Sequence, residues 1–198
     1  MIKKISGLSV REQQSIEIIK NKLGIKPKLV LDPTFLLEKE DYLKIVRNFT
    51  TNIDINKNYL CSYILDKSKL KQKYIQKVSR SLNLSIIDMK VGEENFIEKY
   101  IFSINICKSI ITDSFHGTVF SIIFNKPFLT FINKKRGKAR FSSLGKIFNI
   151  ENRFTNPKKF EKKELEYFTK NLAIDITNYN ILKKESMNFL KQHLMSSK

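Results

Sequence analysis

The sequence has few residues of the kinds that build metal and redox sites. It contains two cysteines, two histidines and no tryptophan. Cys61 and Cys107 are far apart in the sequence and each lies in an apolar run, which excludes a CxxC motif and favours buried free thiols. Free thiols fit a reducing compartment, so we expect a cytoplasmic protein that uses no metal and no cofactor.

Long apolar runs and the common nucleotide-binding motifs are also absent. No stretch approaches the ~18 apolar residues that span a bilayer, and residues 1–14 lack the apolar segment of a signal peptide. The sequence contains no Walker A, GxGxxG, HExxH or GxSxG motif. No pattern supports sequence-specific binding of nucleic acid, so we expect no specific nucleic-acid partner.

Acidic residues are scarce: 19 Asp and Glu stand against 37 Lys and Arg, giving a formal net charge of +18. One explanation is an anionic partner. The other is the composition of an AT-rich genome, because lysine, asparagine and isoleucine are frequent throughout the chain. A basic surface would also hold the protein near anionic lipid, so peripheral contact with the inner face of a membrane is a further expectation.

From residue 59 onward, short apolar runs alternate with amphipathic segments. Such runs predict strands buried on both faces, separated by helices. The expected strands are 59–65, 84–87, 109–112 and 127–132, and the expected helices are 68–82, 94–106, 115–124 and 141–148. This alternation predicts an α/β fold with a Rossmann-like, doubly wound parallel sheet.

The rest of the chain gives weaker patterns. We expect strands at 5–10 and 28–31, helices at 11–23 and 41–49, and a helical segment at 163–190 with a break near 177–180. These patterns divide the chain into three consecutive domains, 1–30, 31–160 and 161–198, of which the second is Rossmann-like and the third consists of C-terminal helices.

The strongest functional pattern runs from Asp113 to Gly117, between a predicted strand and a predicted helix. Ligands of open parallel sheets lie at the carboxyl ends of the strands, and a helix start favours an anion. Ser114 offers a hydroxyl, and His116 offers a donor or a proton near neutral pH. Gly117 lets a ligand or a neighbouring strand approach closely. As alternatives, Asp113 or Ser114 is a structural N-cap, and His116 is a satisfied surface or core group.

A second cluster of cations follows the predicted strand 127–132, and its members are Lys134, Lys135, Arg136, Lys138 and Arg140. Cations there would bind a phosphorylated ligand, with bidentate contacts from Arg136 or Arg140. The alternative is a solvated basic loop. A third candidate is Arg11, at the strand-to-helix junction Ser9–Glu12, which either reaches an anion or is a plain surface residue.

Together these residues resemble the polysaccharide pyruvyl transferase family. The run TDSFHGTVFSIIFNKPF is similar to the family's most recognisable block, SVRE and LDPTFLL are similar to its upstream markers, and ARFSSLGKIFNIENRF is similar to its downstream segment. The resemblance covers roughly residues 5–155. It places the family's motif histidine on His116, its arginine on Arg11 and, more weakly, another on Arg140.

The resemblance implies a GT-B-like enzyme of two Rossmann-like domains, of which this chain is the C-terminal half. It makes residues 1–30 the remnant of an N-terminal domain or an interdomain segment, and residues 31–160 a Rossmann-like donor-binding domain. It implies transfer of pyruvyl from phosphoenolpyruvate to sugar hydroxyls of an exopolysaccharide or another cell-surface glycan, with a free or lipid-linked acceptor. Because the family is roughly twice as long, we expect a truncated chain whose partner is a missing N-terminal domain or a second copy. The alternatives are a GT-B-type glycosyltransferase domain that uses a nucleotide-sugar, and a non-catalytic fragment that binds an anionic partner.

Overall fold

The computed structural model of the protein describes residues 7–132, 137–158, 160–170 and 176–195. Contacts divide the chain into two compact units that interleave in the sequence. Unit 1 comprises residues 1–37, 135–151 and 174–198, and unit 2 comprises residues 38–134 and 152–173. Compact units need not coincide with domains, so the three consecutive domains expected from the sequence stay a prediction.

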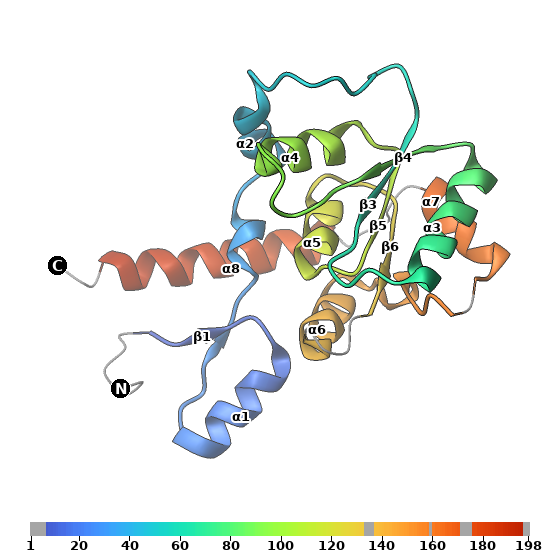
Figure 1. The fold of residues 1–198 in the computed structure, drawn as a ribbon. Coiled ribbons are helices and arrows are strands. Elements are labelled where there is room, and N and C mark those ends of the chain that lie inside the picture. Colours follow the sequence, from blue (N-terminus) through green and yellow to red (C-terminus); the bar gives the residue numbers. More distant parts are fainter. Residues whose placement is uncertain (1–6, 133–136, 159, 171–175, 196–198) are drawn as a thin grey trace. The chain divides into compact units, whose positions relative to one another are not determined.

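A parallel sheet forms the centre of unit 2 (Figure 1). Within the described residues it has five strands in the order β4-β3-β5-β6-β7, and each neighbouring pair is parallel. The strands are β3 (Tyr59–Tyr63), β4 (Ser85–Asp88), β5 (Ser109–Thr112), β6 (Phe128–Phe131) and β7 (Phe154–Thr155). The predicted α/β fold with a parallel sheet is confirmed.

Helices cover both faces of this sheet. The helical elements of unit 2 are α2 (Lys39–Leu43), η3 (Lys44–Val46), α3 (Lys69–Leu82), α4 (Phe96–Ile106), α5 (Phe115–Ile123), η6 (Lys162–Leu165) and α7 (Glu166–Thr169). Helices α4 and α5 lie on one face, and α3 and α7 lie on the other (Figure 1). Side chains of β3, β5 and β6 alternate between the two faces, which explains their almost unbroken apolar sequence.

The two layers have different cores. Beneath α3 and α7 the core is aliphatic and aromatic, with Leu60, Ile64, Tyr74, Ile75, Val78, Ile111, Leu129, Phe131 and Phe168 as its buried members. Beneath α4 and α5, Tyr100 contacts the rings of Tyr63 and Phe120 edge-on, with centroids 5.0 and 5.3 Å apart. The parallel strands are therefore fixed from both sides.

Unit 1 holds the short parallel pair β1 (Ser9–Val10) and β2 (Lys28–Leu29). Its helical elements are α1 (Gln13–Leu23), η2 (Pro33–Leu36), α6 (Lys138–Phe148) and α8 (Ile176–Met195). Phe35 anchors the packing, because its ring centroid lies 5.1 Å from that of Phe148 and 5.8 Å from that of Tyr179.

Three predictions about secondary structure were wrong in part. The expected break near 177–180 falls inside the continuous helix α8, where Asn178 donates to the Ile147 carbonyl and Tyr179 to the Phe35 carbonyl. The helix expected at 41–49 begins earlier and is shorter, since Glu38 and Asp41 form a capping box before α2. Residues 149–157, where the sequence predicted neither a helix nor a strand, contain η5 (Glu151–Arg153) and strand β7.

Candidate functional site

The connections of the sheet diverge between β3 and β5. Strand β3 leads through α3 to β4 on one side, whereas β5 leads through α5 to β6 on the other. Such a switch point leaves a crevice at the carboxyl ends of the two strands, where ligands of doubly wound sheets bind. The sequence DSFHG follows β5 directly, so it lies at this point.

Asp113, the first residue after β5, is buried, and its side chain is 0% exposed. Its two oxygens accept hydrogen bonds from the backbone N–H of Leu65 at 2.6 Å and of Asp66 at 3.1 Å. Lys71 Nζ, in the first turn of α3, lies 2.6 Å from the same carboxylate. The geometry therefore favours the structural alternative for Asp113, although the carboxylate tethers the β3–α3 loop and does not cap α5.

Ser114 caps α5, because its Oγ accepts a hydrogen bond from the Gly117 N–H at 3.3 Å. The hydroxyl proton of Ser114 is still available for donation. Close packing explains why a glycine occupies position 117, because an added Cβ would lie 2.2 Å from Thr112 Oγ1. Of the two explanations for this glycine, close approach by the neighbouring strand is the one that the geometry supports.

His116 is exposed on the first turn of α5, whereas Phe115 and Gly117 on either side of it are buried. Its ring lies edge-on to the ring of Phe115, with centroids 5.4 Å apart. The turn therefore presents the imidazole at the carboxyl end of the sheet, where the positive end of the helix dipole favours an anion. This arrangement can bind a phosphate or carboxylate and can deliver a proton.

Lys71 is a site residue that the sequence did not reveal. In the sequence it is one of several lysines of an amphipathic helix, and that pattern predicts a solvated side chain. In the structure its side chain is 13% exposed, and its ammonium donates to the Asp66 carbonyl as well as to Asp113. No local signal identifies Lys71, because its carboxylate partner, Asp113, is distant in the sequence and follows strand β5.

Arg11 and Arg140 both lie in unit 1, each beside a carboxylate. Arg11 forms an ion pair with Asp32, whose side chain is 4% exposed. Arg140 Nε lies 3.9 Å from Glu12 Oε1, and the Arg140 side chain folds over Gly137, the positive-φ residue that precedes α6. A pocket of about 390 Å³ surrounds the Arg11 segment, and its lining residues are Ser9, Val10, Arg11, Glu12, Ser15, Val30, Leu31 and Pro33.

The structure does not place the other cations of the predicted cluster 134–140 in a site. Lys134, Lys135 and Arg136 lie outside the described residues. Lys138 opens α6. Among the described residues, no group of three or more His, Cys, Asp and Glu side chains is close enough to hold a metal ion, and no helix has the length and apolarity to cross a membrane.

Comparison with known proteins gives one match. A family model described as polysaccharide pyruvyl transferase matches residues 1–135. The matched segment includes Arg11 and the turn with His116 and ends before Arg140. No curated protein and no solved structure matches the chain.

Proposed function

Because the chain belongs to the polysaccharide pyruvyl transferase family, we propose that it transfers a pyruvyl group from phosphoenolpyruvate to sugar hydroxyls of a cell-surface polysaccharide or its precursor. The observation that carries this proposal is the position of His116. The exposed imidazole lies at the switch point between β3 and β5. Its turn is tethered to the β3–α3 loop, because the Asp113 carboxylate accepts two backbone hydrogen bonds from that loop.

Phosphoenolpyruvate carries a phosphate and a carboxylate on a three-carbon frame, and the start of α5 suits such a ligand. The N-terminal dipole of α5 and the Ser114 hydroxyl favour negative charge there, and His116 adds a donor that can be cationic. Fixed donors of this kind need no reorganisation when negative charge develops on the phosphate that leaves the enol carbon.

The proposed reaction begins with a proton that adds to C3 of phosphoenolpyruvate, using the electron pair of the C2–C3 double bond. A sugar hydroxyl attacks C2, and phosphate leaves with the electron pair of its C–O bond. A second hydroxyl of the sugar then attacks C2 and closes a cyclic ketal. Of the two hydroxyl protons released, one balances the proton at C3 and the other leaves with phosphate.

His116 has two compatible roles in this scheme: it donates the proton to C3, or it binds the departing phosphate. Arg11 and Arg140 are arginines of unit 1, and we propose that they bind an anionic part of a substrate. Arg136 stays in the proposal on the sequence argument alone.

The architecture and the partners belong to the same proposal. The parallel sheet of unit 2 supports equivalence with the donor-binding half of a GT-B-like enzyme. The acceptor would be a sugar or lipid-linked glycan at the cytoplasmic face of the membrane, and the net charge of +18 supports peripheral contact with anionic lipid there. A second domain or a second copy would complete the enzyme.

Calorimetric titration of the full chain with phosphoenolpyruvate tests the proposal. His116→Ala is the informative variant, because the exposed side chain can be removed without opening the core. Inorganic phosphate and a UDP-sugar serve as ligand controls. Selective binding of phosphoenolpyruvate that is at least about tenfold weaker in the variant is expected, as for the loss of one charge-assisted hydrogen bond.

Two outcomes would contradict the proposal. Equal affinity for phosphoenolpyruvate and inorganic phosphate would mean that the turn recognises only a phosphate group. Tighter binding of the UDP-sugar would favour the alternative of a glycosyltransferase that uses a nucleotide-sugar. In a second assay, phosphate released from phosphoenolpyruvate in the presence of candidate sugars would measure the complete reaction.

A further inference from the structure

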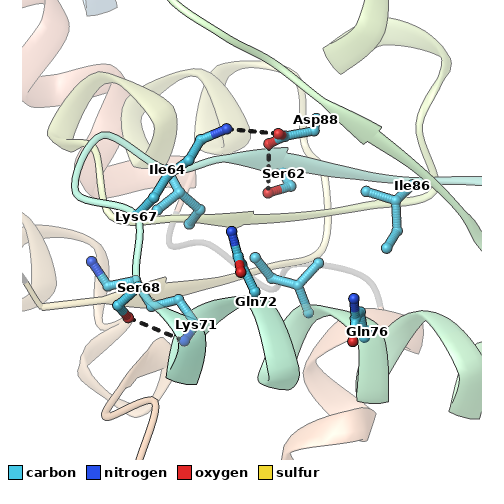
Figure 2. A pocket seen from close by; sticks show the side chains of 10 residues that line it. Ser62, Ile64, Lys67, Ser68, Lys71, Gln72, Gln76, Ile86 and Asp88 are labelled. Carbon is cyan, nitrogen blue, oxygen red and sulfur yellow. Dashed lines mark hydrogen bonds and ion pairs between the residues drawn. The ribbon is translucent and has the colours of Figure 1, made fainter.

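A groove runs between α3 and the strands β3 and β4, on the sheet face that α3 covers (Figure 2). It has a volume of about 320 Å³, and its lining residues are Ser62, Ile64, Lys67, Ser68, Lys71, Gln72, Ile75, Gln76, Ile86 and Asp88. Strand β4 is an edge strand, and Ile86 on it is 39% exposed. The groove exists because α3 leaves this edge of the sheet partly uncovered.

The charges of the groove are compensated, although the protein as a whole is strongly basic. Lys67 Nζ lies 2.8 Å from Asp88 Oδ2. Lys71 Nζ lies 2.6 Å from Asp113 Oδ2 and also donates to the Asp66 carbonyl. Each lysine of the lining therefore faces its own carboxylate, and the groove offers no excess positive charge to a phosphate or a sulfate.

The remaining lining is suited to a neutral, hydroxylated ring. Ile86, 39% exposed, supplies an apolar surface on which the C–H face of a pyranose can lie, and the largely buried Ile64 and Ile75 line the groove beside it. Gln72 points from α3 toward the strands (Figure 2), and among the described residues no hydrogen bond is formed by the side-chain amide of Gln72 or Gln76. Each amide offers a donor and an acceptor, which is the combination that a sugar hydroxyl can satisfy.

The groove is connected to the His116 turn through one side chain. Lys71 lines the groove, and its ammonium binds Asp113, the residue that precedes the N-cap of α5. Ligand in the groove therefore lies against the same loop that Asp113 holds at the switch point.

We infer that this groove is a binding subsite for a neutral pyranose unit of the glycan acceptor. The preference for an uncharged, hydroxylated ring follows from the groove itself. The assignment to the acceptor rests on the proposed function, because pyruvyl transfer requires a sugar. The volume of about 320 Å³ suits one ring or two rather than a long oligosaccharide.

The test is a titration of the ¹⁵N-labelled full chain, followed by NMR. The neutral probes are methyl glycosides of glucose, galactose and N-acetylglucosamine, and the charged probes are glucuronate and inorganic phosphate. We expect saturable shifts of the Ser68, Gln72, Gln76 and Asp88 amides with at least one neutral sugar, and a Kd on the order of millimolar for so small a ligand. Absence of saturable shifts there for all three sugars would overturn the inference, and so would stronger binding of a charged probe at those amides.

Substitutions in α3 distinguish sugar binding in the groove from binding elsewhere on the helix. The double variant Gln72→Ala, Gln76→Ala removes both free amides, and its fold is expected to survive because both positions are exposed and alanine favours helix. Its sugar affinity should fall about tenfold, as for the loss of two hydrogen bonds. Lys73→Ala, on the exposed side of α3 and outside the groove, is the matched control and should bind as the wild type does. Equal sugar affinity in the double variant and the wild type would overturn the assignment of this site.

A parallel titration with phosphoenolpyruvate distinguishes this inference from the proposed function. Shifts at Ser114, His116 and Gly117 without any response to sugar would leave the donor site standing and remove the groove. Shifts at the groove amides with sugar, and none anywhere with phosphoenolpyruvate, would keep the groove as a sugar site and remove the proposed transferase activity.

Discussion

Lys71 Nζ and Asp113 Oδ2 lie 2.6 Å apart in an ion pair that is almost fully shielded from solvent, with side-chain exposures of 13% and 0%. The pair joins α3 to the end of β5. This buried salt bridge therefore lies between the His116 turn and the groove that α3 forms with β3 and β4. Two backbone N–H groups of the β3–α3 loop complete the surroundings of the carboxylate. A buried charge with this many partners stabilises the site only while all of them are present.

Replacing Asp113 is therefore expected to destabilise the protein severely. In Asp113→Ala, the Lys71 ammonium and two N–H groups lose their acceptor, and the free energy of unfolding should fall by about 3 kcal/mol. Asp113→Asn keeps the shape and one acceptor oxygen, and should cost about 2 kcal/mol. Urea unfolding followed by circular dichroism measures both values.

Asp54→Ala is the control for this pair of variants, because the Asp54 carboxylate has similar partners in an exposed setting: Lys57 Nζ at 3.9 Å and the Asn56 N–H at 3.0 Å. It should change the free energy of unfolding by less than about 0.5 kcal/mol. Equal stabilities for Asp113→Ala and Asp54→Ala would show that the Asp113 carboxylate does not hold the β3–α3 loop.

Gly117→Ala should destabilise the protein through a steric conflict with one side chain. The new Cβ would lie 2.2 Å from Thr112 Oγ1 and 2.9 Å from Thr112 Cβ. The threonine cannot rotate freely, since its Oγ1 donates to the Tyr63 carbonyl and accepts from the Ser114 N–H. We expect a loss of about 1 to 3 kcal/mol, as for other overpacked sites, in thermal or urea unfolding.

Thr112→Ala supplies the second arm of a double-mutant cycle for this contact. It removes Oγ1, so part of the cost of Gly117→Ala should disappear when both substitutions are present, with a coupling of about 1 kcal/mol. Strict additivity of the two substitutions would mean that Thr112 is not what keeps position 117 free of a side chain.

The stability of unit 2 should decrease in alkaline solution because of a buried thiol. Burial, followed by the neighbouring Cys107, raises the pKa of Cys61 well above its ordinary value. The folded state thus keeps the thiol neutral, whereas the unfolded state ionises near its usual pKa of about 8.5. Above that pH the unfolded state binds fewer protons, so the free energy of unfolding falls by up to about 1.4 kcal/mol per pH unit until the folded pKa is reached.

Other buried groups titrate in the same range, so Cys61→Ala is needed to isolate the thiol. Burial raises the pKa of Tyr100, which acts in the same direction, whereas burial lowers the pKa of Lys126, which acts in the opposite direction. The difference in stability between wild type and Cys61→Ala should shrink as the pH rises from 8 to 10. A difference that is constant over this range would contradict a raised pKa for Cys61.

The alternating strands and helices of unit 2 could be predicted from the sequence. Elements that form only through contacts with residues distant in the sequence could not. Strand β5 was predicted with the observed limits, because Ser109–Thr112 is an apolar run ended by a helix cap. Strand β7 was missed, since Phe154–Thr155 is a strand only through its pairing with Thr130 and Phe131 of β6. A strand of two residues has no periodicity of its own to detect.

The same limit explains the site. The position of His116 followed from local order, a strand and then a helix start. The role of Asp113 depends on a loop and on Lys71 on another helix, and the groove depends on an edge strand that α3 leaves exposed. Neither the role of Asp113 nor the groove can therefore be predicted from the residues adjacent in the sequence.

Arg11 and Arg140 should differ in how much they contribute to the stability of unit 1, whether or not both bind substrate. Arg11 is paired with the buried Asp32, which also accepts hydrogen bonds from the Thr34 N–H and hydroxyl. The Arg11 side chain is 38% exposed, but Asp32 is only 4% exposed, so Arg11→Ala should cost about 1 to 2 kcal/mol because the buried carboxylate loses this charged donor. Arg140 Nε lies 3.9 Å from Glu12 Oε1 and both side chains are 26% exposed, so this ion pair should contribute less than about 1 kcal/mol to stability.

Arg140→Ala tests the proposed substrate contact, with the melting temperature measured beside the activity to separate binding from stability. If its guanidinium binds an anionic part of the substrate, phosphate release from phosphoenolpyruvate should slow by about tenfold or more at subsaturating substrate, while the melting temperature stays near that of the wild type. Arg140→Lys keeps the charge but not the bidentate fork, and should recover only part of the rate. Full activity in Arg140→Ala would remove this residue from the site and leave Arg11 as the arginine of unit 1 to be tested by Arg11→Lys.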